Sequence, residues 1–251
     1  MIDPMRDLAL LRAATERLLV TAQALGGAAV TGDNAALAGP SLLPGWTRGH
    51  VLAHVARNAD ALVNVLEGRP MYASAETRDA EIERDAHRPL DVQLADIRDS
   101  AARLHAVASL PADWDRTVAL RNGVTDRAAR IPFRRLVEVE LHHVDLGAGV
   151  GLEDLPEEFL LRETAFLAER FTGHPDVPPT RITAAGGLGT WTTGRAPEGA
   201  ASGGAPEKEL TVEGPPASLV GWLAGRRTAD AALTATAADG SPAAPPAVPP
   251  L

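Results

Sequence analysis

Histidine and glutamate side chains recur at helical spacing in two segments of this 251-residue sequence. In the second segment, Glu138 and His142 lie four residues apart, so on a helix they would share one face. In the first segment, His50 and His54 have the same spacing, and either or both could meet Glu138 from a second helix. Two imidazoles and one carboxylate leave one coordination position of a zinc ion open, as in catalytic zinc sites. We therefore predict a catalytic metal site between two helices.

The Glu138 and His142 pair also has a simpler interpretation, as a solvated pair on an exposed helix face. Apolar residues crowd this helix, however, and a buried glutamate needs a partner to remain charged. These apolar residues are Leu136, Val139, Leu141 and Val144. His143 points off the shared face and is expected either to be structural or to support a ligand, whereas Asp145 could orient an imidazole.

The composition limits both the partners and the reaction. The formal net charge of -9, with no concentrated basic segment, argues against nucleic acid as a partner. No apolar run resembles a signal peptide or a membrane span, so we expect a cytoplasmic protein with no membrane association. The chain has no cysteine, which excludes thiolate ligands and an internal thiol nucleophile. Any thiol chemistry must therefore use a thiol that is brought in.

Apolar periodicity and turn residues predict the helices that position these residues. Predicted helices span residues 4–25, 47–66, 76–85, 90–107 and 132–146, with a hairpin around Asn122. The four long helices with one long crossover suggest an up-and-down bundle, in which facing helices can build a metal site.

The rest of the chain changes character after residue 152. A helix is predicted over 156–171, strands over 180–185, 189–193 and 209–212, and a closing helix over 218–226. We therefore expect an α+β protein: a helical bundle over 1–152, a smaller α+β domain over 153–235, and a poorly ordered Ala/Pro-rich tail over 236–251.

Several segments match a known family in its order over nearly the whole chain. They are residues 42–58, 71–74, 78, 81–82, 138–139, 142–147 and 223–226. In these segments the sequence resembles the mycothiol-dependent maleylpyruvate isomerases, members of the DinB-like metal-binding bundle superfamily. Gly45-Trp46-Thr47 with the two histidines indicates only the superfamily. Met71-Tyr72 and Ala224-Gly225-Arg226 indicate the isomerase branch.

The resemblance implies a zinc ion bound by His54, Glu138 and His142, with water or the thiol of mycothiol in the open position. It also implies that Arg226 faces the substrate. The implied reaction converts maleylpyruvate to fumarylpyruvate, a cis-trans isomerisation in gentisate breakdown.

This chemistry has a physical basis. Zinc lowers the pKa of a bound thiol, and the thiolate can add to the cis double bond. The resulting single bond rotates, and elimination gives the trans product and returns the thiol. A fixed guanidinium would stabilise the negative charge that develops during addition. Arg226 is the first candidate and Arg78 the second, although Arg226 could instead complement a helix dipole, as Arg227 could.

Three other functions are compatible with the same ligands. A mycothiol transferase would use the same zinc to conjugate the thiol to an electrophile. A non-catalytic metal-binding module would act as a sensor or bind a partner. An iron oxygenase with two histidines and one carboxylate is permitted by the ligand set but belongs to other folds. We expect a small-molecule substrate, and a monomer whose site lies between its own domains.

Overall fold

The computed structural model describes residues 2–27, 35–110, 113–195, 209–227 and 230–250. The chain divides into two compact units, Met1–Val150 and Gly151–Leu251, each with its own core. Among the described residues, no helix has the length and apolar character needed to cross a bilayer.

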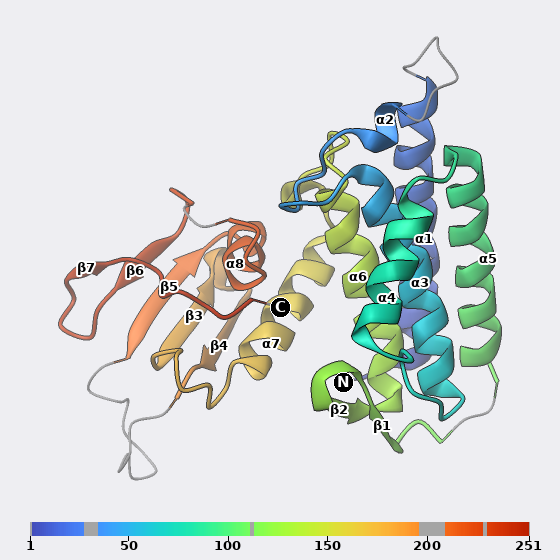
Figure 1. The fold of residues 1–251 in the computed structure, drawn as a ribbon. Coiled ribbons are helices and arrows are strands. Elements are labelled where there is room, and N and C mark those ends of the chain that lie inside the picture. The colour runs from blue at the N-terminus through green and yellow to red at the C-terminus, as the bar shows by residue number, and fades with distance from the viewer. Residues whose placement is uncertain (1, 28–34, 111–112, 196–208, 228–229, 251) are drawn as a thin grey trace. The chain divides into compact units, whose positions relative to one another are not determined.

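Four long helices lie side by side in the N-terminal unit (Figure 1). They are α1 (Pro4–Gly27), α3 (Arg48–Leu66), α5 (Leu90–Ala108) and α6 (Ile131–Asp145). Helix α3 packs on α5 and α6, and α1 closes the bundle against the same two helices. Each helix buries its apolar face, with Leu18, Leu52, Ile97 and Leu136 almost fully covered. The predicted helical bundle is confirmed.

Shorter elements connect these helices. They are α2 (Ala35–Ala38), α4 (Ala75–Ala86), β1 (Thr117–Ala119), η1 (Arg121–Gly123), β2 (Thr125–Arg127) and η2 (Ala128–Arg130). Strands β1 and β2 form the predicted hairpin, with Val118 opposite Asp126. Asn122 adopts a left-handed conformation with φ of 58°, which asparagine tolerates better than most residues.

The start of α3 is held by the residues of the Gly-Trp-Thr segment. The Thr47 hydroxyl accepts from the His50 backbone N–H, and the His50 ring accepts from the Thr47 backbone N–H. The Arg48 guanidinium donates to the carbonyls of Leu146 and Gly147, which follow α6. These bonds fix the first turn of α3 against the end of α6, and so help to set how the two helices that carry the predicted metal ligands pack together.

Gly49 is required by a close approach between helices. A Cβ atom at this position would lie 2.2 Å from the carbonyl oxygen of Ala86, the last residue of α4. Only glycine lets α3 and α4 approach so closely. This contact places α4, which carries Arg78, directly beside α3.

The C-terminal unit combines two helices with a mixed sheet. Its elements are η3 (Leu152–Asp154), α7 (Glu157–Arg170), β3 (Thr180–Ala184), η4 (Ala185–Gly187), β4 (Gly189–Thr193), β5 (Leu210–Gly214), α8 (Pro216–Leu223), β6 (Thr234–Thr236) and β7 (Pro242–Ala243). The strand order is β4-β3-β5-β6-β7, and only β3 and β5 run parallel. Helix α8 packs on β3 and β5 as well as on α7. The predicted α+β class is confirmed.

The expectation of a poorly ordered tail over 236–251 differs from the structure. Strand β7 pairs with β6 at the edge of the sheet, with Ala235 opposite Ala243. The indole N–H of Trp222 also donates to the carbonyl of Pro246, at 2.8 Å. Backbone pairing therefore orders a segment whose composition favours disorder. The predicted division into residues 1–152, 153–235 and 236–251 stays a prediction.

Candidate metal centre

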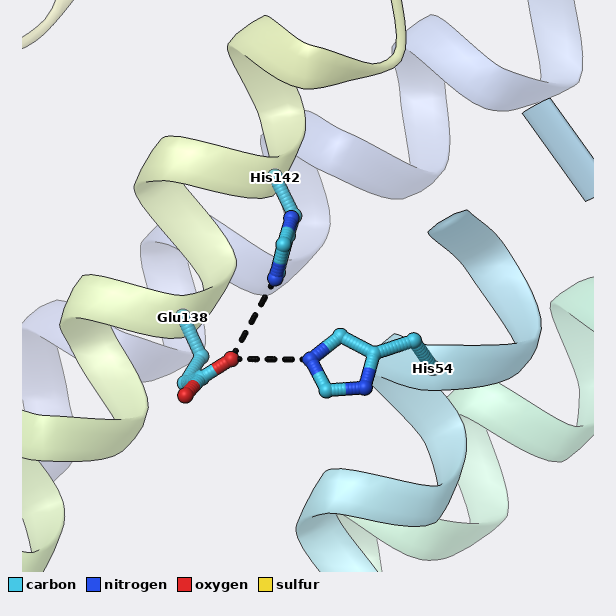
Figure 2. Close-up of side chains that lie close together, drawn as sticks. All are labelled: His54, Glu138 and His142. Carbon is cyan, nitrogen blue, oxygen red and sulfur yellow. Dashed lines mark hydrogen bonds and ion pairs between the residues drawn. The ribbon is translucent and has the colours of Figure 1, made fainter. Parts of the chain in front are cut away.

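Three predicted ligands converge between α3 and α6 (Figure 2). The same carboxylate oxygen of Glu138 lies 3.0 Å from Nε2 of His54 and 3.3 Å from Nε2 of His142. One donor atom from each of the three residues lies within 4.8 Å of the other two. In the described part of the chain, no other three histidine, aspartate or glutamate side chains converge in this way. The structure thus brings together His54, Glu138 and His142.

The spacing suits a small tetrahedral ion. Zinc bonds of about 2.0–2.1 Å place neighbouring ligand atoms roughly 3.3 Å apart in tetrahedral geometry. The distances of 3.0 and 3.3 Å from Glu138 to the two imidazoles are close to that separation. The imidazoles are nearly covered, whereas the Glu138 side chain is 35% exposed. A bound ion would therefore remain accessible to a fourth ligand.

Asp145 fixes the orientation of the His142 ring. Its carboxylate is fully buried and lies 2.9 Å from Nδ1 of His142. This contact turns Nε2 of His142 toward Glu138. A carboxylate behind a ligating imidazole is the common arrangement in metal sites, because it sets the tautomer and raises the basicity of the ring. The role expected for Asp145 agrees with this geometry.

Arg78 contacts the other imidazole. Its Nη2 lies 3.3 Å from Nδ1 of His54, and its Nη1 lies 2.6 Å from a carboxylate oxygen of Asp79. A guanidinium can only donate, so Nδ1 of His54 must accept and Nε2 must carry the imidazole proton toward Glu138. Ligation of a metal through Nε2 requires the opposite tautomer. Metal binding and the Arg78 hydrogen bond therefore compete for His54.

The charges at the cluster are strongly coupled. Burial lowers the pKa of His54 to about 4, with the hydrogen bond to Glu138 opposing this shift. Burial alone would also lower the pKa of His142, but hydrogen bonds with Asp145 and Glu138 raise it above its ordinary value. Burial would raise the pKa of Glu138, but the two imidazoles hold it well below its usual range. Glu138 is therefore ionised at neutral pH.

His50 and His143 lie outside the cluster. The His50 ring is occupied by the start of α3 and by Glu83, whose carboxylate is 3.0 Å from its Nε2. The His143 ring points toward α1, where its Nε2 lies 2.7 Å from the hydroxyl of Thr21. Of the two candidates in the first segment, His54 meets Glu138 and His142, and His50 does not.

The two predicted catalytic arginines lie in different units. Arg78 of α4 contacts the cluster through His54. Arg226 follows α8 in the C-terminal unit, where its Nη1 donates to the carbonyl of Ala224 at 2.8 Å. The role of Arg226 toward the substrate stays a prediction.

Two aromatic residues near the cluster were given no individual role from the sequence. The ring centroid of Trp46 lies 5.4 Å from that of His54. Tyr72, the only tyrosine, lies under the Arg78 guanidinium at 5.8 Å. Burial raises the pKa of Tyr72, and the negative charge of Glu138 raises it further. Tyr72 is therefore a neutral phenol beside the cluster, able to donate a hydrogen bond to a developing anion.

Residues 11–147 match the family described as the mycothiol maleylpyruvate isomerase N-terminal domain. This match covers the whole cluster and more than half of the chain. The chain belongs to this family. No curated protein matches the sequence.

Solved structures of the mycothiol-dependent maleylpyruvate isomerase are similar over nearly the full length. One crystal structure shares 28% identity, covers 97% of this chain and 96% of its own, and superposes with a TM-score of 0.76. A structure of the same isomerase with one histidine replaced by alanine gives the same values. The similarity to the isomerase extends through both units of the chain.

Acid should weaken the binding of a zinc ion to this family member. A proton on His142 competes with the ion, and the hydrogen bonds with Asp145 and Glu138 that raise the pKa of His142 move that competition to higher pH than for an ordinary histidine. We expect the affinity to fall about tenfold per pH unit below this pKa. Chelator competition at pH 8, 7, 6 and 5 measures this slope. An affinity that is constant over this range would contradict the assigned ligands.

Proposed function

We propose that this protein catalyses the mycothiol-dependent cis-trans isomerisation of maleylpyruvate to fumarylpyruvate, using a zinc ion bound by His54, Glu138 and His142. The observation that carries this proposal is the convergence of the three donor atoms in a chain whose similarity to the isomerase covers 97% of its length. The absence of cysteine supports an external thiol, since no internal one exists.

The residues at the cluster have separate roles in this proposal. When bound, the zinc ion lowers the pKa of the mycothiol thiol so that a thiolate is available at neutral pH. Asp145 holds the His142 ring in the tautomer that ligates. His54 would hold the ion through Nε2 with the proton on Nδ1, and Nδ1 would then not accept from Arg78, so this guanidinium would be available to donate to the substrate.

The developing negative charge on the substrate needs fixed donors. Tyr72 stays protonated because its pKa is raised, so it can donate without losing its proton. Arg78 lies over the Tyr72 ring and supplies a permanent positive charge beside it. Such preorganised donors stabilise an enolate more than the neutral substrate, which lowers the barrier. Arg226 is proposed as a second cation facing the substrate.

Turnover of maleylpyruvate by zinc-loaded protein tests this proposal. We expect the substrate to isomerise with mycothiol present in less than stoichiometric amount, because the reaction regenerates the thiol. No turnover is expected without mycothiol or after zinc is removed by a chelator, and restored zinc should restore activity. Stoichiometric loss of mycothiol would instead indicate a transferase that conjugates the thiol. Bound zinc with no thiol-dependent reaction would indicate a non-catalytic module.

A further inference from the structure

A cavity of about 660 Å³ opens in the N-terminal unit. Its walls come from the end of α3 and the segment after it, the start of α4, and the β1–η1 hairpin. Tyr72 and Arg78 line this cavity, and Arg78 also contacts His54. Arg78 therefore connects the cavity to the cluster, although none of the three predicted ligands lines the cavity itself.

The cavity is strongly cationic. Four arginines line it, Arg69, Arg78, Arg116 and Arg121, and its lining contains no aspartate or glutamate. This concentration of positive charge stands out in a chain whose formal net charge is -9. A cavity lined by one sign of charge raises the local concentration of ligands of opposite sign. The expected ligand is therefore an anion.

The four guanidinium groups are not equally available. Arg69 pairs with Glu67, and Arg78 pairs with Asp79. Arg116 donates to the carbonyl of Leu66 at 2.5 Å, and this acceptor is neutral.

Arg121 is exposed at the first position of η1, on the hairpin. Its guanidinium makes no hydrogen bond or ion pair with any of the described residues. The hairpin thus brings Arg116 and Arg121 to one wall of the cavity, and neither forms an ion pair with a carboxylate in the part of the chain that the structure describes.

We propose that Arg116 and Arg121 bind the carboxylate of the substrate that lies farther from the cluster, and that they make the protein selective for dicarboxylates. This inference rests on the proposed function. Maleylpyruvate carries a carboxylate at each end, whereas mycothiol is a sugar conjugate that has none. The wall formed by Arg116 and Arg121, here called the arginine wall, therefore suits the substrate and not mycothiol. Guanidinium groups bind carboxylates through paired, charge-assisted hydrogen bonds.

Binding of inert analogues tests this wall without turnover. Adipate has six carbons and two carboxylates, and hexanoate has the same length with one. For zinc-loaded protein, we expect Arg121→Ala to weaken adipate binding about tenfold by calorimetry, because a hydrogen bond to a charged group is lost. Hexanoate binding should stay unchanged, because its single carboxylate would bind near the cluster. Arg116→Ala should act in the same direction, and the double variant should no longer prefer adipate.

Kinetics give a second readout and the controls. Arg121→Ala should raise KM for maleylpyruvate with little change in kcat, and Arg121→Lys should restore part of the affinity. Arg127→Ala removes an exposed arginine of the same hairpin that does not line the cavity, and it should match the wild type.

Unchanged adipate binding in Arg121→Ala and in the folded double variant would overturn the proposal. If the wild type fails to isomerise maleylpyruvate, the function is wrong, yet the adipate measurements still test the arginine wall.

Discussion

Replacement of His54 by alanine is expected to lower zinc affinity by more than about 100-fold and to reduce isomerisation to background. Loss of a hydrogen-bond partner behind a metal ligand already costs about 10–100-fold, so loss of a ligand should cost more. The variant leaves only Glu138 and His142, both from α6, to hold the ion. Zinc content after dialysis, a competition titration and maleylpyruvate turnover measure the effect.

The matched control is His105→Ala, because His105 is an exposed histidine of the same bundle that lies outside the cluster. This control should bind zinc and turn over substrate as the wild type does. Circular dichroism of both variants separates loss of the ion from loss of the fold. A His54→Ala variant that is folded and keeps its zinc would show that the ligand set is wrong. Loss of zinc with full activity would remove the metal from the mechanism.

The helices could be predicted because their signals are local. Apolar periodicity marked the buried faces, and capping residues marked several ends, such as Thr47 before α3 and Pro89 before α5. The pair Glu138 and His142 followed from the same local geometry, since four residues make about one helical turn. Spacing within one helix was therefore enough to predict two of the three ligands, Glu138 and His142.

The third ligand needed more than spacing. His50 and His54 lie on one face of α3, so residue pattern alone left both open. The difference is that His50 lies in the first turn, where the exposed backbone N–H of Thr47 and the carboxylate of Glu83 engage its ring. His54 lies one turn further, inside the bundle, where it meets Glu138. The family resemblance selected His54, and the structure supplies the physical reason.

Features that depend on distant contacts were missed. Strands β6 and β7 are short and rich in alanine, threonine and proline, so no alternation marked them. They are ordered by pairing, β6 against β5 and β7 against β6. The arginine wall forms because the β1–β2 hairpin faces the segment after α3. Spacing along the chain does not reveal that contact. Arg135 is 1% exposed and hydrogen-bonded to Asn58, although arginine is rarely buried and nothing local marked it.

Replacement of Arg226 by alanine is expected to lower kcat for maleylpyruvate about 100- to 1000-fold, the usual cost of removing one fixed donor to a developing anion. Zinc affinity should not change, because Arg226 lies in the C-terminal unit and the ligands lie in the bundle. The melting temperature should change little as well. Steady-state kinetics, zinc titration and thermal unfolding of the same preparation test these three statements.

Replacement of the neighbouring Arg227 is the matched control for this test. Its guanidinium donates to Glu153 at 2.5 Å and to Asp230 at 3.0 Å, and its side chain packs against Gly221 of α8. Arg227→Ala should therefore cost about 1 kcal/mol of stability, or roughly 2–4 °C in melting temperature, while kcat of the folded enzyme stays close to the wild-type value.

The opposite pattern, in which Arg226→Ala melts earlier and remains active, would make Arg226 a structural residue at the end of α8. Arg78 would then be the only arginine left of the two proposed to stabilise the anion. Its contact with His54 places it at the cluster within a single unit, so the bundle would carry the proposed chemistry without a residue from the C-terminal unit.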